Sequence, residues 1–310
     1  MFIRNSYESM DRTDKTILPN ASIGKIQQNK FDIAGKDIVI GMLQTLSMKE
    51  FNISSFESFG LTIIDETHHI SSKIFSKALF NVCTKYMLGL SATPIRKDGL
   101  TKVLNWFIGD IFYSVTRENQ SQVNVKTIAF SCDEYKEEVP LNKIGKVSLS
   151  TVITKLCNIE KRNELILFYI KKSLDDKRKI IILTDRREHC TNLFSLSKDT
   201  LPSTNTYGLY LGGMKQNDLS KSELCDVIFA TFSLAHEGLD IPTLDTLILA
   251  SPKTDIVQSC GRILRETQGK KNDPLIYDIC DSFASLPNQA RKRMVYYKNS
   301  GFIINNKVNT

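Results

Sequence analysis

The stretch LTIIDETHH, residues 61–69, joins a short apolar run to two acids. Leu61 to Ile64 are apolar or β-branched, which predicts a buried strand. Asp65 and Glu66 follow at the predicted carboxyl end, where parallel sheets bind their ligands. In a nucleotide hydrolase, one such acid holds Mg²⁺, largely through water, and its neighbour orients or deprotonates the attacking water. A strand-to-helix turn whose acids favour the helix N-terminus is the alternative.

The same alternation of short apolar runs and helical segments continues along the chain. Strands are predicted at 37–42, 61–65, 86–93, 179–185, 207–213, 226–232, 244–251 and 274–280. Strands that alternate with helices indicate βαβ units and parallel sheets, so we expect an α/β fold with two tandem domains. The expected division is 1–117 for the first domain, 118–145 for a polar connecting segment, 146–290 for the second domain and 291–310 for a basic C-terminal tail.

Composition narrows the class of protein only a little. The 310 residues are 41% hydrophobic and carry a formal net charge of +7, which suits a polyanionic partner but also many proteins that bind none. Seven scattered cysteines without a CxxC pair predict neither disulfides nor a zinc site, and they indicate reduced thiols in an intracellular protein. No apolar run reaches the roughly 20 residues of a membrane span.

QSCGRILR, residues 258–265, has the spacing of a phosphate receptor. In a helix, Gln258, Arg262 and Arg265 share one face, and two guanidiniums there offer planar, bidentate donors. Gly261 weakens a helix, which indicates close approach of a ligand to the backbone. A solvated basic face is the alternative, but such a face does not need this glycine.

Other polar clusters carry weaker signals. His68 and His69 lack the HExxH spacing of a zinc site. Gly238 and Asp240 follow a predicted strand and suit either a contact with ribose or magnesium, or a plain turn.

Taken in order, four segments resemble motifs of the superfamily 2 helicases. DETH (65–68) is similar to motif II, SAT (91–93) to motif III, ATFSLAHEGLDIP (230–242) to motif V and QSCGRILR to motif VI. The resemblance covers roughly residues 20–300. It is closest to the XPB-like and phage UvsW-like branch and to helicases of large DNA viruses.

The resemblance implies an ATP-dependent nucleic-acid helicase or translocase with two tandem RecA-like domains, the first incomplete at its N-terminus. It implies ATP and Mg²⁺ as cofactors, with DNA favoured over RNA as partner and no membrane. Asp65 and Glu66 form the metal site and activate water. Further roles follow by motif: coupling for His68, Ser91 and Thr93; nucleotide contact for Gly238, Asp240, Gln258, Arg262 and Arg265; and nucleic-acid contact for Gln44, Thr45, Gly212, Gly213, Lys215 and Thr231.

The phosphate-binding loop of this family, GxxxxGK[ST], does not occur in the 310 residues. Gly-Lys pairs begin at Gly24, Gly35, Gly145 and Gly269, but none is followed by Ser or Thr or has a glycine five residues earlier. We therefore expect a truncated or split helicase whose P-loop comes from an upstream polypeptide. The alternative is an ATPase-deficient, nucleic-acid-binding remnant, so hydrolysis by this chain alone stays open.

Overall fold

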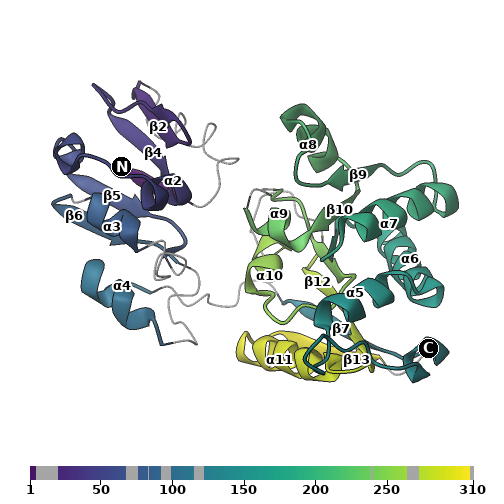
Figure 1. Cartoon of the computed structure of the whole chain (residues 1–310). Coiled ribbons are helices and arrows are strands. Elements are labelled where there is room, and N and C mark those ends of the chain that lie inside the picture. Colours follow the sequence, from purple (N-terminus) through teal and green to yellow (C-terminus); the bar gives the residue numbers. More distant parts are fainter. Residues whose placement is uncertain are drawn as a thin grey trace. The chain divides into compact units, whose positions relative to one another are not determined.

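The computed structural model describes residues 1–4, 20–67, 76–82, 84–91, 99–114, 122–237, 239, 241–263 and 272–307. They form two compact units, Met1–Arg117 and Glu118–Thr310 (Figure 1). Each unit is built on a largely parallel sheet with helices, which confirms the predicted α/β class. None of the helices in the described ranges is long and apolar enough to cross a membrane.

The first unit holds a six-stranded sheet in the order β3-β2-β4-β1-β5-β6. Its elements are β1 (Phe2–Arg4), β2 (Ile23–Gln27), β3 (Lys30–Phe31), β4 (Ile38–Met42), α2 (Leu43–Met48), the 3-10 turn η1 (Ile53–Phe56), β5 (Leu61–Ile64), α3 (Lys77–Asn81), β6 (Tyr86–Gly89) and α4 (Thr101–Phe107). Only the β2–β3 pair is antiparallel among these strands. The predicted strands β4, β5 and β6 are confirmed, whereas β1 was missed because three residues are too short for a pattern.

The second unit holds a seven-stranded, all-parallel sheet in the order β13-β7-β12-β11-β8-β10-β9. Its strands are β7 (Asn124–Phe130), β8 (Ile180–Thr184), β9 (Tyr207–Tyr210), β10 (Val227–Thr231), β11 (Thr246–Leu249), β12 (Leu275–Asp281) and β13 (Ile303–Lys307). Its helices are η3 (Asp133–Lys136), α5 (Leu149–Cys157), α6 (Glu160–Asp175), α7 (Arg187–Thr200), α8 (Gln216–Glu223), α9 (Phe232–Glu237), α10 (Val257–Ile263) and α11 (Leu286–Asn299).

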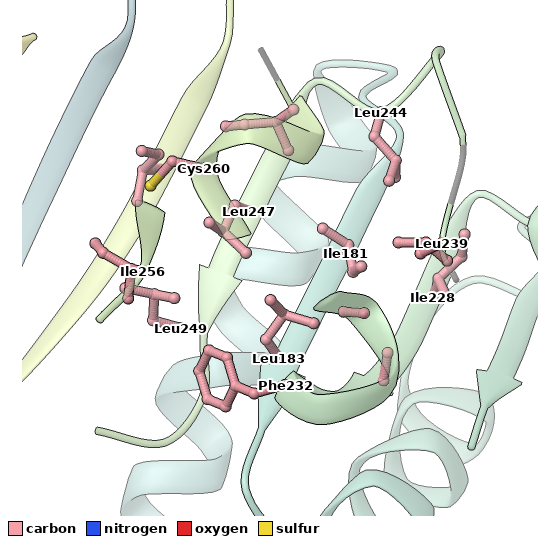
Figure 2. Close-up of a cluster of buried hydrophobic side chains, with 14 of the residues drawn as sticks. Ile181, Leu183, Ile228, Phe232, Leu239, Leu244, Leu247, Leu249, Ile256 and Cys260 are labelled. Carbon is pink, nitrogen blue, oxygen red and sulfur yellow. The ribbon is translucent and has the colours of Figure 1, made fainter. Parts of the chain in front are cut away.

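Alternate residues of the central strands fill two cores, one on each face of this sheet. Ile181 and Leu183 of β8 point to the face covered by α9 and α10, where Phe232 and Cys260 join them (Figure 2). The residues between them point to the opposite core, under α6 and α7. Burial on both faces explains why β8 reads as a continuous apolar run.

Two segments differ from the expected division of the chain. Residues 118–145 were expected to connect the domains, yet they contain β7, which pairs with both β12 and β13. Residues 291–310 were expected to form a basic tail, yet α11 and β13 incorporate most of them. The physical reason lies in α11, where Arg293 and Tyr297 fall four residues apart and are 2% and 0% exposed.

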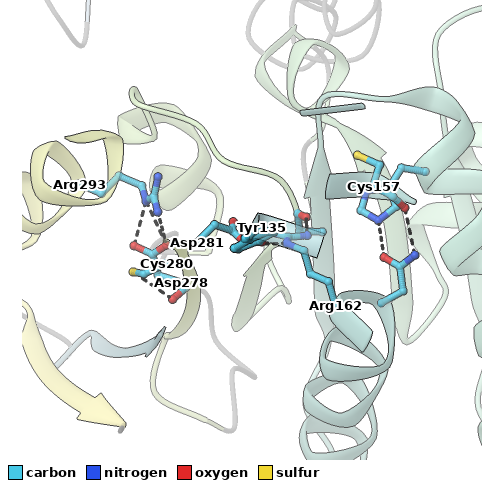
Figure 3. A network of polar contacts seen from close by, with 10 residues as sticks. Tyr135, Cys157, Arg162, Asp278, Cys280, Asp281 and Arg293 are labelled. Atoms are coloured by element: carbon cyan, nitrogen blue, oxygen red, sulfur yellow. Dashed lines mark hydrogen bonds and ion pairs between the residues drawn. The ribbon is translucent and has the colours of Figure 1, made fainter. Parts of the chain in front are cut away.

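A buried ion pair joins α6 to the end of β12. The Arg162 guanidinium donates from Nε and Nη2 to the two carboxylate oxygens of Asp281, at 2.8 and 3.0 Å, and from Nη1 to the Ala250 carbonyl at 2.6 Å (Figure 3). The Tyr135 hydroxyl donates to the same carboxylate at 2.6 Å. Both charged side chains are completely buried, so each depends on the other for its solvation.

Arg162→Ala is expected to lower the free energy of unfolding of the second unit by about 3–5 kcal/mol, because it leaves the buried Asp281 carboxylate uncompensated. Urea unfolding followed by circular dichroism measures the change. The matched control is Lys136→Ala, which breaks the exposed Lys136–Asp133 pair and should leave stability nearly unchanged. Similar small effects for both variants would contradict the assignment.

A second buried chain of polar groups runs through His189. Its Nδ1 lies 2.9 Å from the Thr184 hydroxyl, and its Nε2 lies 2.9 Å from Oδ1 of Asn163. Burial, together with the positive charge of Arg162, lowers the pKa of His189 to about 3. The imidazole is therefore still neutral in the folded protein near pH 6.5, where His189 of the unfolded chain takes up a proton.

Because the pKa of His189 is lower in the folded state, its contribution to stability should be present above about pH 6.5 and lost as the pH falls towards 3. The loss amounts to about 2 kcal/mol at pH 5. Urea unfolding at pH 7.5 and pH 5 should show that His189→Gln loses less stability between the two conditions than the unmodified chain. An equal pH dependence of the two proteins would refute the assignment.

Candidate functional site

The carboxyl ends of parallel strands gather the polar residues of the first unit at one sheet edge. Gln44 and Thr45 follow β4, Asp65 and Glu66 follow β5, and Ser91 comes shortly after β6. Since β4, β1, β5 and β6 run in the same direction, all these residues lie at the same edge. The sheet therefore brings together residues that are up to 47 positions apart in the sequence.

The two acids after β5 occupy a constrained turn. The Asp65 amide donates to the Ile3 carbonyl at 3.0 Å, and the Asp65 carboxylate accepts the Glu66 amide at 3.0 Å. Glu66 has φ of 50°, in the left-handed region that non-glycine residues rarely adopt. Such a conformation costs about 1 kcal/mol or more and is concentrated at functional sites. Both side chains are partly buried.

The residue after these acids ties β5 to β6. Thr67 is 5% exposed, and both its amide and its hydroxyl donate to the Leu90 carbonyl, at 3.0 and 2.6 Å. A Cβ on Gly89 would lie 2.9 Å from the Thr67 methyl group, so the close approach requires glycine there. The ends of β5 and β6 are therefore joined at this point, with Ser91 one residue beyond Leu90.

Gln44 and Thr45, which are expected to contact nucleic acid in the first unit, differ in exposure and in hydrogen bonding. Gln44 is exposed, whereas the Thr45 hydroxyl accepts the Gln28 amide at 3.0 Å. Gln28 has φ of 49°, so this bond supports the tight turn between β2 and β3. Thr45 consequently has a structural task in addition to any contact with a ligand.

The second unit presents its own loops at the carboxyl ends of β9 and β10. Gly213 has φ of 81° in the turn after β9, and the Gly212 carbonyl accepts a hydrogen bond from Arg187. Lys215 ends this loop as the exposed N-cap of α8. Thr231 ends β10 and is 8% exposed, with its hydroxyl 3.3 Å from the Ser233 hydroxyl. The expected nucleic-acid residues of this unit thus share one sheet edge.

Positions 258 and 262 lie four residues apart in helix α10 and therefore share one face of the helix, while the phosphate contacts expected of Gln258 and Arg262 stay a prediction. The opposite face is anchored in the core by Cys260 and Ile263, both fully buried. Gly261 is exposed, and a Cβ added to it would meet no atom of the described chain within 4 Å. Packing within the described part of this unit therefore does not require a glycine at this position.

A network that the sequence reading missed fixes the loop leading into α10. Nε and Nη2 of Arg293, on α11, donate to the Asp278 carboxylate at 2.7–3.0 Å (Figure 3). Its Nη1 donates to the Lys253 carbonyl at 2.8 Å. Lys253 in turn pairs with Asp185 at 3.1 Å and lies over the Phe232 ring. The ends of β8, β11 and β12 are thereby joined. In the sequence, the four-residue spacing of Arg293 and Tyr297 was the one indication that both lie on a buried face of a helix.

Several predicted site residues fall outside what the structure describes. These are His68, Thr93, Gly238, Asp240 and Arg265, together with the side chain of Arg262.

Comparison with known proteins was made for the whole chain. A family model described as "Type III restriction enzyme, res subunit" matches residues 3–96. Protein L396 of Acanthamoeba polyphaga mimivirus, named as an ATP-dependent RNA helicase, is 32% identical over 98% of this chain and 60% of its own length. Helicase D10 of Escherichia phage T5 is 29% identical over 90% of this chain and 61% of its own length.

The chain is related to the superfamily 2 helicases of viruses and phages along almost its whole length. It spans about 60% of the length of the relatives it matches.

Solved structures show the fold of this family in tandem form. Saccharomyces cerevisiae Dbp5 bound to RNA and ADP BeF3 aligns with a TM-score of 0.53 and 12% identity, over 93% of this chain and 70% of its own. Mss116p bound to ssRNA and AMP-PNP aligns with a TM-score of 0.57 and 13% identity, over 89% and 54%. The two units are therefore tandem RecA-like domains, as the sequence predicted.

The two acids after β5 suit a hard cation. Asp65 and Glu66 offer carboxylate oxygens, the ligands that Mg²⁺ prefers. Within the described ranges, no group of three or more His, Cys, Asp or Glu side chains is arranged to hold a metal ion. This donor set fits a cation that keeps most of its water and takes further oxygens from nucleotide phosphates, rather than a cage made by protein alone.

Gly261→Ala is expected to raise the free energy of unfolding of the second unit by about 0.5–1 kcal/mol, because alanine is the better helix former and its methyl group meets open space. Urea unfolding at neutral pH measures this change. If the glycine admits a ligand, the same variant should bind nucleic acid or nucleotide more weakly while being more stable. A destabilised variant would show that Gly261 serves packing instead.

Proposed function

We propose that this chain is the larger part of an ATP-dependent nucleic-acid helicase or translocase, whose phosphate-binding loop is supplied by polypeptide outside these 310 residues. The observation that carries the proposal is the turn at Asp65 and Glu66. Two carboxylates are held at the carboxyl edge of a parallel sheet, one of them on a strained backbone, in a chain of helicase ancestry. Strained backbone of this kind is concentrated at functional sites, and Gln28, Lys177 and Ala284 also adopt it in this chain, so the proposal depends on the two acids and their place at the sheet edge.

The proposed roles follow from where each side chain lies. Asp65 holds the Mg²⁺ site, largely through water, and Glu66 orients or deprotonates the attacking water. Bound Mg²⁺ neutralises charge on the nucleotide phosphates. Arg262 and Arg265, aided by Gln258, stabilise charge on the transferring phosphoryl group. Gly238 and Asp240 contact the nucleotide by analogy with the family motif.

Coupling between hydrolysis and movement is proposed for the segments that follow β5 and β6. His68, Ser91 and Thr93 take this role in the family motifs. Thr67 supports the proposal physically, because its two hydrogen bonds to Leu90 join the acid-bearing turn to the segment containing Ser91.

The edge of the first sheet suggests where the missing loop attaches. Strand β6 has β5 on one side, and no described strand pairs with its other side. Tyr86 on this strand and Leu90 directly after it are 59% and 47% exposed, which is unusual because parallel sheets are normally covered. A further parallel strand added here would end beside Ser91 and Asp65, at the place where a P-loop must lie to present phosphates to the acids.

Contact with nucleic acid is proposed at the carboxyl edge of each sheet, taken by itself. Gln44 and Thr45 contact its backbone from the first unit, and Gly212, Gly213, Lys215 and Thr231 do so from the second. DNA is our preferred partner on the XPB-like resemblance of the motifs. RNA is the competing choice, since the mimivirus relative is named as an RNA helicase.

Glu66→Gln and Arg262→Ala are each expected to reduce nucleic-acid-stimulated ATP hydrolysis at least 100-fold, because proton transfer and phosphoryl-charge stabilisation are typically worth that much. Phosphate release is measured with the chain joined to the segment encoded upstream of Met1 that carries a strand and GxxxxGK[ST]. The 310-residue chain alone should show no comparable rate, since it lacks the lysine and amide cradle.

The second candidate function is a nucleic-acid-binding remnant without ATPase activity, favoured by the absence of a P-loop in the sequence. It requires salt-sensitive binding of nucleic acid that ATP does not change. The absence of any upstream frame encoding a P-loop would select this candidate. Family-like hydrolysis by the 310 residues alone would overturn both accounts of the phosphate site.

A further inference from the structure

The turn between β2 and β3, formed by Gln28 and Asn29, is bonded to helix α2 and its C-cap. Because β2 runs parallel to β4, this turn lies at the carboxyl edge of the first sheet. The Gln28 amide donates to the Thr45 hydroxyl at 3.0 Å. The ammonium group of Lys49, the C-cap of α2, donates to the Gln28 carbonyl and to Oδ1 of Asn29. The turn is thus fixed beside Gln44 and Thr45, which are expected to contact nucleic acid.

An aromatic cluster fixes the ring of Phe31, the residue that ends β3. The Phe31 and Phe51 rings stack, with centroids 5.2 Å apart and planes inclined by 22°. Phe56 makes T-shaped contacts with both rings, at 6.2 and 5.9 Å, and is completely buried in the core of the first unit. The Phe31 ring is therefore already immobilised, and little conformational entropy remains to be lost when it binds a ligand.

The immobilised ring of Phe31 is nevertheless open to solvent. Phe31 is 44% exposed, and none of the motifs of the sequence analysis includes it. Strand β3 lies at one end of the six-stranded sheet, and no described strand pairs with its outer side. A rigid aromatic ring at an open edge can stack on another flat ring, and every nucleobase offers such a face.

Lys49 leaves a positive charge at the same turn. Both oxygens to which it donates are uncharged, and it forms no ion pair with any residue that the structure describes. Its side chain is exposed, and one of its three N–H donors remains for a further acceptor. An aromatic ring beside a lysine of this kind is the combination with which proteins bind the bases and the backbone of single strands.

We propose that Phe31 stacks on one base of a single-stranded nucleic acid, while Lys49 binds a neighbouring phosphate. This inference rests on the proposed nucleic-acid function. It adds contact with a base to a site whose other expected members, Gln44 and Thr45, contact the backbone. Stacking tolerates every base, so the contact raises affinity for single strands without a preference for sequence. A base inside a duplex does not offer its face, because its neighbours in the stack cover it.

The test compares two single strands of equal length, one with all its bases and one in which every base is missing from an intact sugar-phosphate backbone. Fluorescence anisotropy gives the affinity of the 310-residue chain for each strand, in DNA and in RNA. The unmodified chain should bind the base-bearing strand at least about fivefold more tightly, since loss of a single stacked base typically costs that much or more.

Phe31→Leu, which keeps an apolar side chain and removes the ring, should weaken binding of the base-bearing strand at least about fivefold. Binding of the abasic strand should not change, because the backbone contacts remain. Phe31→Trp keeps an aromatic face and should retain the preference for bases. The matched control is Phe80→Leu. Phe80 is 64% exposed and contacts the Phe107 ring at 5.0 Å, but it lies on α3, which leads to the amino end of β6.

Lys49→Gln removes the charge and keeps a side-chain N–H group for the turn. It should reduce the slope of log K against log salt by about 0.7, the value for one phosphate contact on a single strand. Lys85→Gln is the control, because Lys85 is exposed and directly precedes β6 at the amino edge of the same sheet. Equal slopes for the two variants would overturn the phosphate contact of Lys49.

The outcomes separate the stacking contact from the function on which it rests. Equal affinity of the unmodified chain for the two strands would overturn the stacking contact and leave the proposed function standing. An equal loss for both strands in Phe31→Leu would also overturn it, because a purely structural role of the ring affects both strands alike. Thermal melts establish that each variant folds. No binding of either strand by the unmodified chain would overturn both proposals.

Discussion

The Asp278 carboxylate and the Arg293 guanidinium form the interaction on which the functional edge of the second unit depends. Both groups are almost completely buried, and the Tyr297 hydroxyl donates a further bond to Asp278 at 3.0 Å. Nη1, the one guanidinium nitrogen that does not donate to this carboxylate, donates to the Lys253 carbonyl. Through Lys253, this single pair fixes the position from which α10 begins.

Because the strands are parallel, a few such interactions are sufficient to fix the loops at the carboxyl edge of the second sheet. Every strand of the second sheet ends at the same edge, so a loop fixed at one strand end constrains its neighbours. The ion pair between Lys253 and Asp185 joins the loops that follow β11 and β8, and so helps to fix the positions of these strand ends. The first unit uses hydrogen bonds instead, because Thr67 joins two strand ends through one carbonyl, that of Leu90.

Periodicity and motif order predicted the strands that matter most, including β5 and β8, because burial on both faces leaves a continuous apolar run. The same reading missed β1, which is three residues long, and took the inward face of α11 for part of a basic tail. Arg293 looks like surface charge until Asp278 is known to lie opposite it. The left-handed backbone of Glu66 could not be predicted either, because the residue type Glu does not indicate a positive φ.

The backbone strain at Glu66 bears on the choice between the two proposed functions, an ATP-dependent helicase and a nucleic-acid-binding remnant. The loops of the second unit are held by buried charge pairs, so they would keep their shape whether or not a nucleotide is ever hydrolysed. Glu66 differs, because its conformation costs about 1 kcal/mol or more and none of the strand pairing around it requires a carboxylate. Gln28, Lys177 and Ala284 also have positive φ, so a left-handed backbone by itself does not distinguish a catalytic turn from a structural one. What sets Glu66 apart is its place beside Asp65 at the carboxyl edge of a parallel sheet, where the proposed role of its carboxylate is open to the ATPase test.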